Sequence, residues 1–436
     1  MNMRAILSAA AMLSATGGGG AAAAAETIDI SQPALDGALW SESAESVIER
    51  LDGSGLEWTS PSRTSARSLS KAQTFGPLPL LESALWVEDG EVQKAGYLIY
   101  SRGDTGGLRE EEFEQLLRKT RATLDGIFES RPESHSERST VNLESLVWHE
   151  NESTFTLEWS TTREVKSRGI PYRAEFLRLI ATPPPEEISV VERSLRRLDQ
   201  RRAGTKVEKE ATRRANGDVI LEGIPMIDQG PKGYCVVASV ERLLRYFERE
   251  ADQHELAQVA NTSAERGTST KAMLEALEDV SGRLNIRVDT EYRFDAREFE
   301  RMVQRYNRYA GRNDVQEVVI PRNTAISMLD IYAQMDGGTL RDARTSSKSD
   351  LGRFSRDIQR AIDDGVPLLW TVMLGLLPEP DIPQAFGGHM RLIIGYNQRN
   401  DEIIYSDSWG AGHEEKRMPV ADAWTMTTGL YTLETR

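Results

Sequence analysis

Hydrophobic and polar positions in residues 76–185 change period twice, which predicts a small α+β domain. The stretch 84–101 alternates apolar and polar positions around Asp89-Gly90, as two strands joined by a turn would. Apolar residues then recur at helical spacing across 109–130, after an acidic first turn. Strand-like alternation returns in two later segments, 144–162 and 172–182. A helix packed against an antiparallel sheet would bury these faces.

From residue 219 to residue 436, helical patterns come first and strand patterns last. Helical spacing is found at 235–249, 252–260, 269–282, 295–310, 323–335 and 350–364. Apolar strand patterns follow at 366–374, 389–397, 402–409 and 429–435. Because strands and helices do not alternate, the order predicts an α+β fold for residues 219–436 rather than a parallel sheet.

Two segments show no comparable period. Residues 26–75 are rich in Ser, Glu and Gly and predict an irregular N-terminal segment, apart from a short helix at 43–51. Residues 186–218 follow a proline-rich boundary and predict a charged helical linker. Its basic run could bind an anionic partner, but no aromatic residues are interleaved, which favours a solvated linker helix.

The first 25 residues have the pattern of a secretory signal peptide. Arg4 precedes the apolar stretch "AILSAAAMLSA", and "AAAAA" ends just before Glu26, as at an A-x-A cleavage site. An uncleaved membrane anchor is the alternative, but the apolar stretch is short and is followed by "GGGG". We therefore expect an exported bacterial protein, periplasmic or secreted, with no stable membrane insertion after cleavage.

The composition of the chain limits the classes of partner and cofactor that it could bind. The formal net charge is −15, which argues against nucleic acid as a general partner. One cysteine cannot build a thiolate metal site, and no His-x-x-x-His pair is present, so no metal or other cofactor is expected. The same single cysteine leaves the exported chain without an internal disulfide, and its stability must come from its core.

That cysteine, Cys235, stands in "DQGPKGYCVVAS", between a turn and a predicted helix. Gly230 and Gly233 favour the turn, and apolar residues recur at helical spacing after it. Cys235 therefore begins a helix, where the macrodipole favours a thiolate and free backbone N–H groups can bind an oxyanion. Gln229, six positions earlier, is a side-chain donor that could assist.

A thiolate nucleophile needs a base that also protonates the leaving group. His389 is the best placed of five histidines, since it follows "AFGG" and begins a predicted strand. The next strand ends in "YSDSWG", so two antiparallel neighbours would bring Asp407 beside His389. His413 is a rival base, although nothing upstream of it would orient its ring. His254 and His149 are interpreted as structural.

Three ordered blocks, "QGPKGYCVVAS", "GGHMRLIIGYN" and "SDSWG", resemble the signature of papain-like cysteine peptidases. The stretch "GVPLLW" is similar to the bacteriocin-leader-processing relatives of that group. The resemblance covers about residues 219–436. It implies a papain-like domain with a helical half and an antiparallel β half, and a cleft between them that segment 375–388 would line or gate. It also implies an enzyme, a cysteine-type peptidase acting on protein or peptide substrates.

The resemblance also implies roles for individual residues. Cys235 would be the nucleophile and His389 the general base and acid. Gln229 would donate to the oxyanion, Asp407 would orient His389, and Trp409 would cover that pair from solvent. The chain departs from papain in having aspartate where papain has asparagine, and in having Val236 after the cysteine instead of tryptophan.

Several alternatives stay open from the sequence. Another thiol acyl-transfer activity, transglutaminase-like or amidase-like, would use the same residues, and a non-catalytic binding module could retain the fold. The N-terminal domain does not match the helical propeptide of the family. It could be an inhibitory pro-segment, a substrate-recruiting domain or a partner-binding module. The oligomeric state is not predicted.

Overall fold

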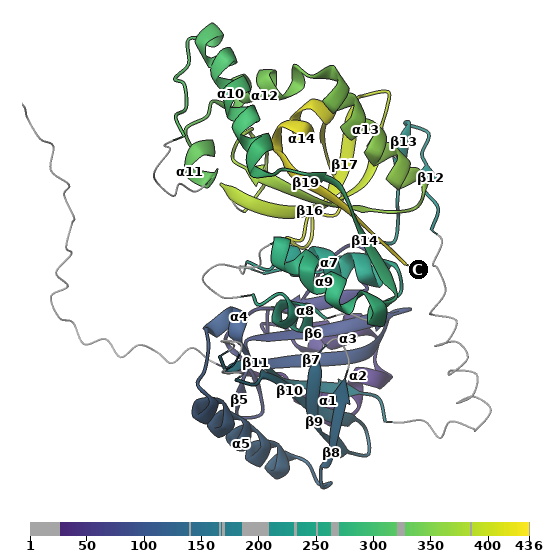
Figure 1. Cartoon of the computed structure of the whole chain (residues 1–436). Coiled ribbons are helices and arrows are strands. Elements are labelled where there is room, and N and C mark those ends of the chain that lie inside the picture. Colours follow the sequence, from purple (N-terminus) through teal and green to yellow (C-terminus); the bar gives the residue numbers. More distant parts are fainter. Residues whose placement is uncertain are drawn as a thin grey trace, which may run out of the picture.

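The computed structural model describes residues 27–138, 141–164, 167, 171–184, 209–230, 233–249, 252–262, 270–320, 328–383 and 386–435. The predicted signal peptide and residues 186–208 of the predicted linker lie outside these ranges. Figure 1 shows an N-terminal domain in purple and blue and a C-terminal domain in green and yellow.

The N-terminal domain is built on an antiparallel sheet with one long helix. Eight strands of the described residues form it in the order β2-β3-β6-β7-β11-β10-β9-β8. They are β2 (Glu57–Trp58), β3 (Ser65–Ser68), β6 (Glu82–Glu88), β7 (Glu91–Ser101), β8 (Glu133–Arg138), β9 (Asn142–His149), β10 (Thr154–Thr162) and β11 (Arg173–Thr182). The helix α5 (Glu110–Ile127) buries Phe113 and Leu124 in the core of this domain. The helix and strands predicted for residues 84–182 are present.

The prediction of an irregular segment at 26–75 is wrong. The short helix expected at 43–51 is present as α3 (Ala44–Arg50). The segment also contributes α1 (Gln32–Leu35), α2 (Ala38–Ser41), β1 (Ile28–Asp29) and β4 (Gln73–Phe75), in addition to β2 and β3. Ala34 and Leu39 are fully buried in the domain core. Elements of two to seven residues are too short to show a period. They form because distant partners hold them, as in the pairing of β3 with β6.

The C-terminal domain has a helical half and an antiparallel β half. Its described helices are α7 (Cys235–Tyr246), α8 (Gln253–Val259), α9 (Thr270–Leu284), α10 (Ala296–Asn313), α11 (Met328–Tyr332), α12 (Gly337–Thr345), α13 (Lys348–Asp363) and α14 (Val420–Met426). The helical patterns of the sequence predict six of these and miss α12 and α14. Within the described ranges, no helix is both long and apolar enough to cross a membrane.

The β half is one sheet with the order β12-β13-β16-β15-β19-β14, to which β17 and β18 add beside β16. Its strands are β12 (Thr212–Arg213), β13 (Asp218–Ile220), β14 (Ile286–Arg293), β15 (Leu368–Leu374), β16 (Gly387–Asn397), β17 (Glu402–Ser406), β18 (Lys416–Pro419) and β19 (Thr427–Thr435). The four predicted strands are present as β15, β16, β17 and β19, while β14 was not predicted. The α+β fold class is confirmed.

Residues 209–218 are not helical, so this end of the linker prediction is wrong. β12 and β13 form a tight hairpin around Gly217, whose φ is +97°, and β13 pairs with β16. The carboxylate of Asp218 accepts two bonds from Arg417, at 2.8 and 2.7 Å. A charged residue of the segment that was expected to form a solvated helix instead holds the edge of the sheet in place.

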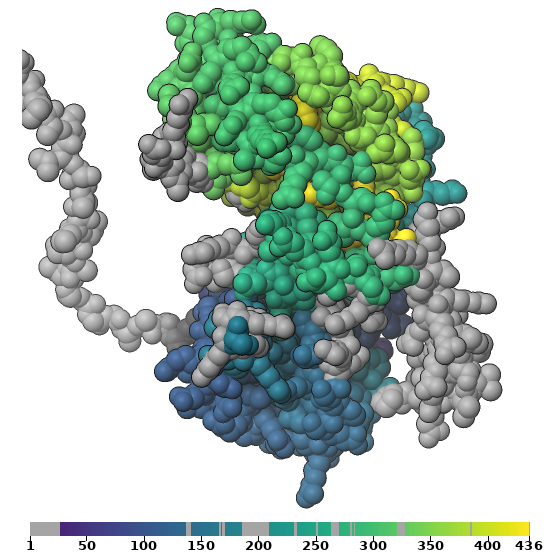
Figure 2. Space-filling model, in the orientation of Figure 1, coloured from purple at the N-terminus to yellow at the C-terminus, as the bar shows by residue number. Residues whose placement is uncertain are grey.

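The helices α7, α8 and α9 lie between the two sheets, as Figure 1 shows. In Figure 2 the green surface of the C-terminal domain lies directly against the blue surface of the N-terminal domain. Arg178 of β11 reaches across to α8, 2.8 Å from Asp252 at its N-cap and 3.2 Å from Glu255. The hydroxyl of Tyr234, just before α7, lies 3.3 Å from the Ser101 hydroxyl of β7. The two domains are therefore joined along the helical half of the C-terminal domain.

The contact of Tyr234 with the N-terminal domain requires a glycine at position 103. A Cβ on Gly103 would lie 1.9 Å from the Tyr234 hydroxyl, whereas a Cβ on nearby Gly107 would meet nothing within 4 Å. We expect Gly103→Ala to lower stability by about 1–3 kcal/mol, although alanine by itself favours a helix. Thermal unfolding of both variants measures this. A melting temperature of Gly103→Ala equal to that of Gly107→Ala would contradict the contact.

Candidate active site

Cys235 is the first residue of α7, and Tyr234 is the N-cap. The helix forms because its apolar positions, including Val236 and Val240, all face the domain core. The Cys235 side chain is half-buried and makes no disulfide. The thiol therefore stands where the first backbone N–H groups of a helix are free to bind an anion.

His389 is the third residue of β16 and pairs with Val372 of β15. β17 runs antiparallel on the other side and ends at Ser406, so Asp407 directly follows its last residue. His389 Nε2 donates to Asp407 Oδ1 at 2.5 Å, and both side chains are fully buried. His389 Nδ1 makes no hydrogen bond to any described residue. That nitrogen is the one left for the thiol.

Asp407 is held ionised by two cations. Besides His389, Arg391 Nε donates to its Oδ2 at 2.7 Å, and the Ser408 N–H donates to Oδ1 at 3.0 Å. Burial raises the pKa of Asp407, but the interactions with His389 and Arg391 outweigh burial and lower it to about 2. Arg391 is fully buried, and its Nη1 donates to Glu379 at 2.8 Å.

The pKa of His389 moves in the opposite direction. Burial lowers it, but the negative charge of Asp407 and the Cys235 thiol outweigh burial and raise it to about 9. The imidazole is therefore protonated at neutral pH. A cysteine thiol beside an imidazolium, with a carboxylate behind the ring, is the arrangement that activates a cysteine nucleophile.

Trp409 covers the His389 ring. The two rings are stacked, with centroids 4.3 Å apart and an interplanar angle of 11°. The rival base His413 lies edge-on to Trp409, with centroids 5.6 Å apart. Its backbone carbonyl accepts from the Asp407 N–H at 2.8 Å, so His413 supports the turn that carries Asp407. Its ring does not line the cleft that contains Cys235.

Gln229 is buried beside the Asp407 turn. Its backbone N–H donates to the Ser408 carbonyl at 2.8 Å, and its Oε1 accepts from the Ser408 hydroxyl at 2.7 Å. The acceptor end of the amide is thus fixed on Ser408, and the other end is the donor. Gly230, next in the chain, packs so closely on the N-terminal domain that a Cβ there would lie 2.7 Å from Leu69.

Arg242, two turns along α7 from Cys235, ties the helix to the Asp407 turn. Its guanidinium is buried and donates to the Asp407 carbonyl at 2.8 Å, the Ser406 hydroxyl at 2.5 Å and the Pro225 carbonyl at 2.8 Å. Sequence reasoning missed Arg242, Arg391 and Glu379. The position of Arg391 could have been predicted, because it follows His389 by two positions and so lies on the same face of the strand.

A cleft of about 540 Å³ opens at the thiol. Cys235, His389, Gly388, residues of α9 and residues of β14 and β15 line it, so it lies between the helical and β halves. No described residue of the N-terminal domain lines it. Of segment 375–388, which was expected to line or gate the cleft, Gly388 is the lining residue among those described. Glu379 instead points inward to Arg391.

Residues 221–432 match the family model described as the Peptidase_C39 like family. Among solved structures, the peptidase domain of Streptococcus ComA, a bi-functional ABC transporter, is 12% identical. The match covers 49% of this chain and 100% of that chain, with a TM-score of 0.25. Xylellain, a cysteine protease from Xylella fastidiosa, is 11% identical, over 52% of this chain and 92% of that chain, with a TM-score of 0.27. No curated protein matches the sequence.

The match to this family model thus falls on the C-terminal domain, the part of the chain whose sequence resembles papain-like cysteine peptidases. The resemblance found in the sequence is thereby confirmed. The roles of the individual site residues remain predictions that the geometry makes specific.

The buried ion pair predicts how His389 titrates. Because its pKa is raised to about 9, the imidazolium should persist through neutral pH and be lost as pH rises through 9. In Asp407→Asn burial remains while the negative charge is removed, so the pKa should fall by about one unit or more. NMR titration of the histidine ring signals, with His389 assigned by its loss in His389→Gln, measures both values. The exposed-turn variant Asp89→Asn is the control, and an unchanged pKa in Asp407→Asn would refute the pairing.

Proposed function

We propose that this protein is an exported cysteine peptidase that hydrolyses peptide bonds through Cys235, His389 and Asp407. The observation that carries the proposal is that Cys235 and His389 line one cleft while Asp407 holds the far nitrogen of the His389 ring. The match of residues 221–432 to the Peptidase_C39 like family model supports the same chemistry. Protein or peptide is the substrate class that this chemistry implies.

The proposed reaction begins when the Cys235 thiolate attacks the peptide carbonyl carbon. A C–S bond forms and the carbonyl electron pair moves onto oxygen, where the Gln229 amide and the Cys235 N–H would stabilise it. His389 then gives its proton to the amine nitrogen as the C–N bond breaks. Water attacks the resulting thioester with loss of its proton to His389, which releases the acid and restores the thiolate.

In this proposal the N-terminal domain is a permanent brace and not an inhibitory pro-segment. An inhibitory segment must block the cleft, and no described residue of this domain lines it. The domain instead touches both ends of the turn that carries the oxyanion donor and the nucleophile. Leu69 packs on Gly230, and Ser101 contacts Tyr234.

The nucleophile is tested with matched variants. We expect Cys235→Ala to remove peptidase activity toward a denatured protein substrate. Cys235→Ser should retain at most a small fraction of the activity, since an alcohol is far less ionised than a thiol at neutral pH. Gln229→Ala should retain the fold while losing about 10²–10³ in kcat. Activity and labelling by a thiol-directed peptidase inhibitor are the measurements.

Three outcomes would change the assignment. Full activity in Cys235→Ala would refute the proposal. Transfer of the acyl group to an added primary amine, without hydrolysis, would favour a transglutaminase-like enzyme. A wild-type Cys235 that reacts with the inhibitor no faster than a free thiol would favour a non-catalytic binding module.

Export is tested by the mass of the mature protein. The pattern of residues 1–25 supports cleavage just before Glu26. Mass spectrometry of protein expressed in a bacterium with a periplasm should therefore find a chain that begins at Glu26 and still contains the N-terminal domain. A chain that retains Met1 would contradict export through this signal. Loss of the whole N-terminal domain from the active species would contradict the proposal that this domain is a permanent part of the enzyme.

A further inference from the structure

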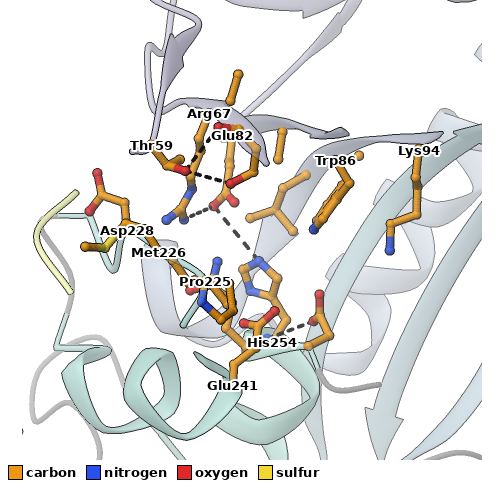
Figure 3. Close-up of a pocket in the computed structure, with 18 of the residues that line it drawn as sticks. Thr59, Arg67, Glu82, Trp86, Lys94, Pro225, Met226, Asp228, Glu241 and His254 are labelled. Carbon is orange, nitrogen blue, oxygen red and sulfur yellow. Dashed lines mark hydrogen bonds and ion pairs between the residues drawn. The ribbon is translucent and has the colours of Figure 1, made fainter. Parts of the chain in front are cut away.

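A second cavity lies at the seam between the two domains. Its volume is about 150 Å³, and it shares no lining residue with the cleft that contains Cys235. Strands β3, β6, β7 and β11 contribute to one side, and α7, α8 and the segment 225–228 contribute to the other. Figure 3 shows Arg67 and Glu82 on the sheet side and Glu241 and His254 on the helix side.

The charges around this cavity are balanced. Its lining holds four carboxylates and four cationic side chains in addition to His254. They are Glu82, Asp228, Glu241 and Asp252, and Arg67, Lys94, Arg178 and Arg245. Three direct pairs join them: Arg67 to Glu82 at 2.6 Å, Arg245 to Glu241 at 2.7 Å and Arg178 to Asp252 at 2.8 Å. His254 also lies 4.0 Å from Glu82 across the cavity. A ligand with a net charge would upset this balance, whereas a zwitterion would keep it.

Several hydrogen-bond donors and acceptors of the lining side chains make no hydrogen bond in these pairs. Arg67 Nε and Nη1 and Arg245 Nε are buried and have no hydrogen-bond partner among the described residues. The same holds for the acceptors Glu241 Oε2 and Gln253 Oε1. A buried polar atom without a partner costs about 1–3 kcal/mol. The cavity therefore offers a site for a molecule that accepts at one end and donates at the other.

The cations near Glu241 do not fully offset the effect of burial on its carboxyl group. Burial raises its pKa to about 7, and Asp252 adds to this effect, while Arg245 and Lys94 oppose it without cancelling it. An ammonium group beside Glu241 Oε2 would favour the ionised carboxylate.

The apolar part of the lining, on the sheet side, includes Ala84 and Trp86. The ammonium group of Lys94 lies over the Trp86 ring, 4.2 Å from its centroid.

We propose that this seam cavity binds a free α-amino acid with a small side chain. The carboxylate accepts from Arg67, the ammonium donates to Glu241 and Gln253, and the side chain packs toward Trp86. A cavity of about 150 Å³ holds a ligand of roughly six heavy atoms, since a cavity of that size accommodates benzene. Alanine and serine fit this limit. The proposal does not rest on peptidase activity.

Thermal unfolding with added ligands tests the proposal. L-Alanine and L-serine should each raise the melting temperature by a few degrees in a saturable way, because ligands of the native state stabilise it. Propionate and ethylamine, which carry one charge each, should not do so at equal ionic strength. Absence of any saturable effect up to about 10 mM, ten times the Kd of a millimolar site, would show that the cavity holds only water.

Variants separate this site from general effects of the ligand. Arg67→Met and Glu241→Gln should abolish the shift, while Arg118→Met, at an exposed position of α5, should retain it. Gln253→Leu removes one acceptor without exposing a buried charge and should weaken the shift even if the other two variants fold poorly. An equal shift in wild type, Arg67→Met and Gln253→Leu would overturn the proposal.

Discussion

The interaction on which the active-site geometry depends is the buried carboxylate of Asp407. A fully buried carboxylate stays ionised only when cations and N–H donors surround it, and removing one partner of such a pair costs about 3–5 kcal/mol. Here the partners are His389 and Arg391. Arg391 in turn requires Glu379, which also accepts from the Tyr405 hydroxyl at 3.0 Å. One charge thus fixes the ends of β16 and β17 and the segment that follows β15.

The position of the nucleophile depends on the same turn through backbone atoms. Arg242 of α7 donates to the Asp407 carbonyl, so the helix that begins at Cys235 is tied to the residue that orients the base. Burial lowers the pKa of Arg242 to about 10, and Asp407 opposes this effect, so the guanidinium remains charged at neutral pH. A shift of about 1 Å in a catalytic group is enough to cost 10²-fold in rate. A fully buried guanidinium with three acceptors is well suited to prevent such a shift.

The sequence predicts the three candidate site residues and misses the residues that hold them in place. Cys235, His389 and Asp407 stand in short blocks with a recognisable order, and the alternation of β16 and β17 is enough to place the last two side by side. Arg242 lies on an ordinary amphipathic helix, and two of its three partners are 164 and 165 residues away, so no local pattern marks it. The strands of residues 26–75 were missed for the same reason, because they depend on distant partners, as in the pairing of β3 with β6. The short helix expected at 43–51 is present as α3.

The helix α7 connects the site to the N-terminal domain on more than one face. Glu241 is six positions after Cys235, about 240° around the helix at 100° per residue. The thiol can therefore face the cleft while the carboxylate faces the interdomain seam. At the start of the helix, Tyr234 and Gly230 contact the N-terminal domain directly. A domain that packs on α7 and on the turn before it fixes the position of Cys235 whether or not anything occupies the cleft, as the proposed scaffold role requires.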